Sequence, residues 1–249
     1  MADAIRCRLV LDPPADGPWN MAVDEAMLGA ATAGAAVMRL YRWAEPTLSL
    51  GYFQPLAARR EHPASAGCPV VRRLSGGGAI VHDDELTYSL ALPASHPLSA
   101  PGRGLYEAVH GALVEVLAGF GIAARQVEAA DVPSRTEPPF LCFSRRAPGD
   151  VLVGQAKVAG SAQRRRRGAV IQHGSILLGR SPAAPELPGL SELAGRRVEA
   201  ERLGEAWLEI LRGRLGLCWT AGRIESDLFN EARRLRRDRY LAESWNRRF

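Results

Sequence analysis

A series of short strand-like segments, separated by small and polar turns, constrains the fold more than any other feature of this sequence. Val70 to Leu74 is followed by four small residues, Ser75 to Gly78. Ala79 to Val81 then leads through a polar turn at residues 82–85 to another strand pattern, Thr87 to Leu92. Short apolar runs between glycine-rich and polar turns predict adjacent strands. We therefore expect a β-sheet at the centre of the chain.

Further strand patterns, and helix patterns as well, lie before and after this centre in the sequence. Strands are predicted at Ile5 to Leu11, Val37 to Trp43, Thr47 to Tyr52, Val151 to Val153, Ala156 to Ala159 and Val170 to Leu178. Helices are predicted from Pro18 to about Ala33, from Leu105 to Phe120, and as two or three segments from Glu199 onward, with a basic tail from Arg233 to Phe249. This order predicts an α+β fold with a mixed β-sheet flanked by helices. No repeat or long linker divides residues 1–249, so one domain is expected.

The composition places the chain among folded proteins without a membrane span. Of 249 residues, 47% are hydrophobic and 24% are charged, which supplies enough apolar material for a packed core. No apolar run approaches the roughly 20 residues of a membrane span, and Met1 to Asp12 lacks the features of a signal peptide. We expect a cytoplasmic protein with no membrane partner. Its four cysteines stand singly, without a histidine at ligand spacing, so neither disulfides nor a metal site is predicted.

The basic residues single out one lysine. The net charge is +5 at pH 7, which indicates an acidic partner, either a nucleic acid or an acidic protein. Of the 32 lysines and arginines, only Lys157 is a lysine. A compact ammonium fits where a planar guanidinium cannot, and its pKa can shift toward neutrality. Lys157 is therefore a candidate catalytic residue, and the alternative is an ordinary surface lysine.

A glycine-rich turn offers a second candidate site. Arg72 and Arg73 precede Ser75-Gly76-Gly77-Gly78-Ala79, where backbone N–H groups without side-chain cover can hold a phosphate or a carboxylate. No Gly-Lys-Ser/Thr follows, so the turn is not a nucleotide-binding P-loop. A plain hairpin turn is the alternative.

Cys142 is a candidate nucleophile in a long loop. The loop runs from Val132 to Gly149, and proline partly stiffens it. A nearby ammonium would favour the thiolate of Cys142, whereas apolar burial would leave the thiol inert. The loop prolines are Pro133, Pro138, Pro139 and Pro148.

Two histidines and an arginine run have less specific surroundings. His82 and His173 each stand at the end of a strand pattern, where either could be an acid–base group or a hydrogen-bonded structural residue. Gln163 to Gly168, with four consecutive arginines, is predicted to be an exposed hairpin turn. Without interleaved aromatic residues it does not indicate nucleic acid. The other histidines, expected at the surface, are His62, His96 and His110.

Six segments, taken together and in their order along the chain, form a recognisable pattern. They are Trp19 to Ala26, Arg39 to Trp43, Pro46 to Gln54, Arg72 to Ser89, Lys157 to Gln163 and Gln172 to Leu178. Together they resemble the biotin/lipoate A/B protein ligase family, and within it the octanoyltransferases that use a cysteine–lysine pair. The resemblance covers residues 19–178, and the C-terminal helices, about residues 199–249, match only loosely.

The resemblance implies a fold, a reaction and a set of site residues. The fold would be similar to the catalytic core of biotin ligases and class II tRNA synthetases, with the acyl donor in a tunnel beside the glycine-rich turn. Cys142 would take an octanoyl group from octanoyl-acyl carrier protein as a thioester, with Lys157 beside it, without a cofactor. The acceptor would be a lysine of a lipoyl-domain protein, such as the glycine cleavage H protein or a 2-oxoacid dehydrogenase E2.

The other site residues surround this pair. Arg73 and His82 would shape the donor site, and backbone N–H groups of the glycine-rich turn or of Lys157 to Ser161 would hold the oxyanion. The substrate-binding set is Arg72, Arg73, Ser75, Gly76, Gly77, Gly78, Ala79, His82, Gly160, Ser161, His173, Gly174 and Ser175.

Two other functions stay open. A lipoate-protein ligase would use ATP and magnesium to form a lipoyl-adenylate, and Gly76-Gly77-Gly78 follows the ligase pattern where octanoyltransferases usually carry Gly-Gly-Arg. Ser144-Arg145-Arg146 also replaces a more apolar segment. The second possibility is a non-catalytic basic binding module. Biotin ligation is less favoured, because the arginine-rich glycine loop of biotin ligases is not found.

Overall fold

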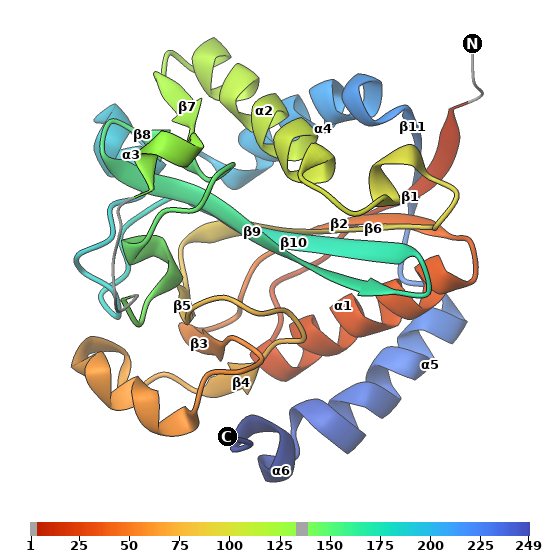
Figure 1. The fold of residues 1–249 in the computed structure, drawn as a ribbon, viewed down its shortest axis with the longest axis horizontal. Helices are drawn as coiled ribbons and strands as arrows, with labels where there is room; N and C mark the ends of the chain where they lie inside the picture. The colour runs from red at the N-terminus through yellow and green to blue at the C-terminus, as the bar shows by residue number, and fades with distance from the viewer. Residues whose placement is uncertain (1–3, 133–138) are drawn as a thin grey trace.

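The computed structural model describes residues 4–132 and 139–249, and it confirms an α+β fold with a large mixed sheet between helices (Figure 1). In the described chain this sheet has the strand order β11-β1-β2-β6-β10-β9-β8-β7. Strand β1 pairs in parallel with β2 and β11, and all other neighbours are antiparallel. The strands are β1 (Ile5–Leu11), β2 (Ala36–Tyr41), β6 (Glu85–Leu92), β7 (Ala124–Gln126), β8 (Val151–Val153), β9 (Ala156–Arg166), β10 (Ala169–Leu177) and β11 (Leu217–Gly222).

Helices cover both faces of the sheet (Figure 1). On one face lie α2 (Gly104–Gly119) and α4 (Ala200–Leu215), and on the other lie α1 (Gly17–Thr32) and α5 (Ser226–Leu235). Helix α1 begins where Asp16 accepts a hydrogen bond from the Trp19 backbone N–H at 2.8 Å. None of the helices in the described residues is long and apolar enough to cross a membrane.

The remaining helical segments are short. They are α3 (Leu190–Ala194), α6 (Glu243–Asn246), η1 (Leu56–Glu61), η2 (Pro63–Ser65), η3 (Pro97–Ser99), η4 (Ala129–Asp131), η5 (Cys142–Ser144) and the π-helical turn η6 (Arg236–Tyr240).

A smaller sheet places the glycine-rich turn against the large one. Its strands are β4 (Val70–Arg72), β3 (Thr47–Leu50) and β5 (Ile80–His82), with β3 in the middle. The turn joins β4 to β5, and the chain passes directly from β5 into β6 of the large sheet. Phe140 and Leu141, from the loop before β8, pack into the core of the small sheet. The turn and this loop therefore meet where the two sheets join.

Three predictions for the second half of the chain are wrong or incomplete. The expectation of helices alone after Glu199 is wrong, because β11 forms the parallel edge of the large sheet. The predicted turn at Gln163 to Gly168 is shorter, because β9 pairs with β10 as far as Arg166. The C-terminal residues are not a tail, since Trp245 is buried. Part of the predicted loop, residues 133–138, lies outside the described residues.

Trp207 anchors α4 to the large sheet and gives a test of this core. Its side chain is fully buried, its ring meets that of Tyr88 edge-on at 4.9 Å, and its Nε1–H donates to Val109 O at 3.2 Å. We expect Trp207→Ala to lower the free energy of unfolding by roughly 3–5 kcal/mol in urea denaturation. Trp219→Ala is the control, because that ring is only partly buried at the edge of the sheet. Equal losses in the two variants would contradict this description of the core.

Candidate active site

A cavity of about 290 Å³ lies where the two sheets, the glycine-rich turn and the loop before β8 meet. Ten of the predicted site residues line it: Arg73, Gly76, Gly77, His82, Cys142, Gly160, Ser161, His173, Gly174 and Ser175. Met21, Tyr41, Ile80, Thr87, Tyr106, Phe143, Ala162 and Gln163 complete the lining. The predicted residues outside the lining are Arg72, Ser75, Gly78, Ala79 and Lys157.

Backbone pairing fixes Cys142 at this cavity. The Cys142 N–H donates to Ala79 O at 2.7 Å, and the Ala79 N–H donates to Phe140 O at 3.0 Å. The loop before β8 thus forms a short parallel bridge with the residue that follows the glycine-rich turn. This pairing explains how a proline-rich loop holds a thiol in one place.

Lys157 lies beside Cys142 and is paired with an acid that the sequence analysis missed. Its Nζ lies 2.7 Å from Asp150 Oδ2, 3.8 Å from Cys142 Sγ and 3.2 Å from Cys142 O. Both Lys157 and Asp150 are buried. The sequence does hold a signal for Asp150. This residue directly precedes the strand pattern Val151 to Val153, which pairs with the strand that contains Lys157.

Gly160 is required by this ion pair. A Cβ at Gly160 would lie 2.6 Å from Lys157 Cε, which is closer than real Cβ atoms come, and it would make a tight contact of 3.1 Å with Asp150 Oδ1. Gly174, on β10, similarly faces Gly160 O and the side chain of Ser161. Two facing glycines thus leave room for the lysine and for the cavity.

Lys157 also faces a second hollow, a surface groove of about 620 Å³. The groove is lined by Phe143, Ser144, Arg145, Arg146, Gln155, Ala156, Lys157, Glu186, Leu187 and Pro188. Phe143 lines both the groove and the cavity. Lys157 therefore stands between the thiol in the cavity and the groove.

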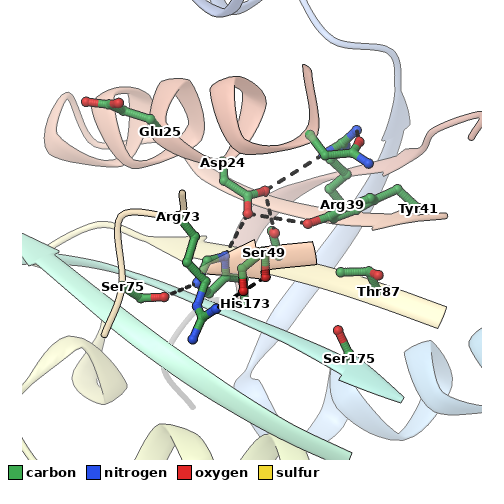
Figure 2. A network of polar contacts seen from close by, with 12 residues as sticks. Asp24, Glu25, Arg39, Tyr41, Ser49, Arg73, Ser75, Thr87, His173 and Ser175 are labelled. Carbon is green, nitrogen blue, oxygen red and sulfur yellow. Dashed lines mark hydrogen bonds and ion pairs between the residues drawn. The ribbon is translucent and has the colours of Figure 1, made fainter. Parts of the chain in front are cut away.

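His173 is held between a hydroxyl and a carboxylate, as Figure 2 shows. Its Nε2 lies 2.5 Å from Ser75 Oγ, and its Nδ1 lies 2.8 Å from Asp24 Oδ2. Asp24 also accepts a hydrogen bond from Ser89 Oγ at 2.6 Å. Ser75 is buried behind the ring and does not line the cavity.

His82 is fixed in the same way. Its Nε2 lies 2.7 Å from Ser49 Oγ, its Nδ1 lies 2.8 Å from Glu85 Oε1, and its ring stacks on Trp43 at 3.8 Å between centroids. Ser175 also donates to Glu85 at 2.8 Å. The hydroxyls that these rings contact, Ser49 and Ser75, are buried and lie outside the cavity lining, so we interpret His82 and His173 as rigid walls of the cavity.

The two adjacent arginines serve different parts of the fold. Arg73 lies under the glycine-rich turn, where its Nη2 donates to Gly76 O at 2.9 Å and Gly78 O at 2.6 Å. Burial lowers the pKa of Arg73 to about 10. The Arg72 guanidinium points away from the cavity and donates to Gly51 O at 2.9 Å and to Trp245 O at 3.1 Å.

The structure relates the two departures from the octanoyltransferase pattern to each other. A Cβ built on Gly78 would collide with the Arg145 guanidinium and would lie 2.9 Å from Phe140 O. An arginine on the loop before β8 therefore occupies the space beside the turn where a side chain at position 78 would begin.

The other cysteines and histidines lie outside the cavity lining. Burial raises the pKa of the Cys7 thiol to about 12, which leaves it inert. The expectation that His96 and His110 are surface residues is wrong, because both are buried. His110 Nδ1 lies 2.6 Å from Gly149 O and its Nε2 lies 3.0 Å from Ser161 Oγ, so this histidine supports the backbone next to Asp150. Among the described residues, no group of three His, Cys, Asp or Glu side chains is placed to bind a metal ion.

Comparison with known proteins places this chain in a family. The lipoyl protein ligase A/B catalytic domain model matches residues 16–184. Octanoyltransferase LipM of Kyrpidia tusciae is 34% identical, over 97% of this chain and 98% of that protein. Octanoyltransferase LipM of Symbiobacterium thermophilum is 33% identical, over 93% of this chain and 94% of that protein.

A solved structure shares the fold. The putative lipoate protein ligase from T. acidophilum superimposes with a TM-score of 0.79 at 22% identity, covering 98% of this chain and 99% of that one. The predicted resemblance is thus confirmed by sequence and by fold. The chain belongs to the lipoyl protein ligase A/B catalytic domain family, and within it to the group of the LipM octanoyltransferases.

Proposed function

We propose that this enzyme transfers an octanoyl group from acyl carrier protein, through a thioester on Cys142, to a lysine of a lipoyl-domain protein in lipoate biosynthesis. The observation that carries the proposal is the thiol of Cys142 at the cavity, 3.8 Å from the ammonium of Lys157. The acceptor would be the glycine cleavage H protein or a 2-oxoacid dehydrogenase E2. The reaction would take place in the cytoplasm, on a single catalytic domain.

In the first step the Cys142 thiolate attacks the carbonyl carbon of the donor thioester. A new carbon–sulfur bond forms and the bond to the donor sulfur breaks. The donor leaves as a thiol after taking up a proton from the Lys157 ammonium, which becomes a neutral amine. The Lys157 ammonium stabilises the thiolate before the attack. Backbone N–H groups of the glycine-rich turn or of Lys157 to Ser161 hold the oxyanion. This exchange of one thioester for another needs no cofactor.

In the second step the acceptor lysine approaches through the groove and attacks the Cys142 thioester. At this stage Lys157 is a neutral amine, because its proton left with the donor thiol in the first step. Lys157 then takes the proton that the incoming amine loses, and Asp150 neutralises the ammonium that results. The amide bond forms as Cys142 leaves as a thiolate, which restores the resting pair.

The covalent intermediate gives the most direct test. We expect an adduct of octanoyl mass on Cys142 when the protein is mixed with octanoyl-acyl carrier protein, measured by intact-mass spectrometry and peptide mapping. Cys142→Ser should form no such thioester and should lose transfer. Cys218→Ser is the matched control, because that thiol is exposed and outside the cavity lining. An unmodified thiol combined with full transfer by Cys142→Ser would overturn the proposal.

Lys157→Arg separates the two roles of the lysine. A guanidinium keeps the positive charge but cannot act as a base near neutral pH. We expect the transfer rate to an acceptor domain to fall at least about a hundredfold, with the Cys142 adduct accumulating. Lys157→Met, which removes the charge too, should lose both transfer and the Cys142 adduct. Transfer by Lys157→Arg at the unaltered rate would remove Lys157 from the mechanism.

The ligase alternative is supported by the glycine at position 78, and it predicts a different donor. A lipoate-protein ligase would need ATP and magnesium and would act on free lipoate or octanoate. We expect transfer from octanoyl-acyl carrier protein without ATP, and no transfer from free acid with ATP and magnesium. Measuring modification of an acceptor domain under the two conditions decides between them, because a requirement for ATP would favour the ligase.

A further inference from the structure

Three aromatic rings, two of them exposed, gather with two arginines beside the glycine-rich turn. We call this the docking patch, and it consists of Tyr52, Phe53, Arg164, Arg248 and Phe249. Phe53 and Phe249 are 70% and 58% exposed. The three rings lie close together, with centroids 4.8 Å apart for Tyr52–Phe53 and 6.1 Å apart for the other two pairs. An exposed aromatic cluster of this kind is typical of an interaction surface.

The arginines of the docking patch are held by rings rather than by acids. The Arg248 guanidinium carbon lies 5.0 Å from the ring centroids of Tyr52 and Phe249, and that of Arg164 lies 5.6 Å from Tyr52. Within the described part of the chain, no carboxylate lies within 4.0 Å of either guanidinium, although Arg166 on the same strand pairs with Glu25. Both charges are therefore oriented and available to a partner.

Buried Arg72 keeps the docking patch in place. Its guanidinium donates to Gly51 O and Gln54 O, at 2.9 and 2.6 Å, and also to Asn246 O at 2.9 Å. One side chain thus joins the turn that carries Tyr52 and Phe53 to the C-terminal segment that carries Arg248. The C-terminal end lies next to β4 in Figure 1.

The docking patch borders the cavity. The Tyr52 N–H donates to Ser75 O at 2.9 Å, and Gly51 packs against Gly77 O so closely that a side chain there would collide. Gln163, the neighbour of Arg164, lines the cavity together with Gly77. A partner seated on the patch would hold a flexible arm next to the glycine-rich turn.

We propose that the docking patch binds the acyl donor, an acidic carrier protein that presents its acyl chain on a phosphate-bearing arm. This inference rests on the proposed function. Two unpaired guanidinium groups among exposed rings complement carboxylates and a phosphate. The acceptor has a separate approach, because the groove at Lys157 is lined by residues of the loop before β8 and by residues 186–188 instead. Donor and acceptor therefore meet the enzyme on different surfaces.

The test compares a carrier-protein donor with a small one. The double variant Arg164→Glu/Arg248→Glu should raise the KM for octanoyl-acyl carrier protein at least about tenfold, because charge reversal weakens electrostatic recognition. Its rate of Cys142 acylation by the N-acetylcysteamine thioester of octanoate should be unchanged, which also shows that the variant folds. Added salt should raise the carrier-protein KM of the unaltered enzyme more than that of the variant.

Arg202→Glu is the charge-matched control for the single variant Arg164→Glu, because each replaces one arginine by one glutamate. Arg202 is also an exposed arginine over a ring, with its guanidinium carbon 5.9 Å from the Phe120 centroid, but it lies on α4 on the opposite side of the large sheet. This variant should leave the KM for the carrier protein unchanged. Equal effects of Arg202→Glu and Arg164→Glu on this KM would mean that net charge alone matters, and the proposal would fail.

Direct binding keeps this inference distinct from the proposed function. Affinity of the acidic carrier protein for the Cys142→Ser enzyme, measured by fluorescence anisotropy, should fall when the docking patch is reversed. If patch-dependent binding occurs without acyl transfer by the unaltered enzyme, the docking surface stands and the proposed reaction is wrong. Unchanged binding and unchanged KM in the double variant would overturn the docking surface while leaving the reaction intact.

Discussion

The buried ion pair between Lys157 and Asp150 is the interaction on which the candidate site depends. The two charged groups are 2.7 Å apart and buried, so removing either partner would leave an uncompensated charge. Their positions follow from the antiparallel pairing of β8 and β9, with a bulge between Val151 and Leu152. The pair in turn requires the glycine at position 160, so the local sequence, the sheet register and the chemistry constrain one another.

Much of the fold could be predicted from sequence. The strands around the glycine-rich turn are short apolar runs bounded by small and polar turns, and the first two long helices are long apolar segments rich in alanine or leucine. Strand β11 could not be predicted in this way. It is an edge strand with mostly exposed side chains, so its apolar pattern is weak and the strand depends on pairing with β1. The basic C-terminal segment was wrongly predicted to be a tail for a similar reason. Its folded position depends on contacts with Arg72, which is far away in sequence.

The candidate site was predictable where composition and motif agreed, and not where it depends on long-range contact. Lys157 stands out because it is the single lysine in a sequence rich in arginine. Asp150 is marked only by its place before a strand pattern, and His110 carries no mark. Each gains its role only when the fold brings it to its partner, Asp150 to Lys157 and His110 to Gly149 and Ser161. The relation between Gly78 and Arg145 likewise becomes visible only in three dimensions, since 66 intervening residues separate them in sequence.

The use of arginine elsewhere explains why lysine stands at the reacting centre. Arg72 and Arg73 hold several backbone carbonyls at once, and a rigid, permanently charged fork is suited to that task. At the reacting centre the same properties would be a disadvantage. The cation there has to fit beneath Gly160, favour a thiolate at one stage and accept a proton at another. A single ammonium, held by Asp150 and facing both the cavity thiol and the groove, meets all of these requirements.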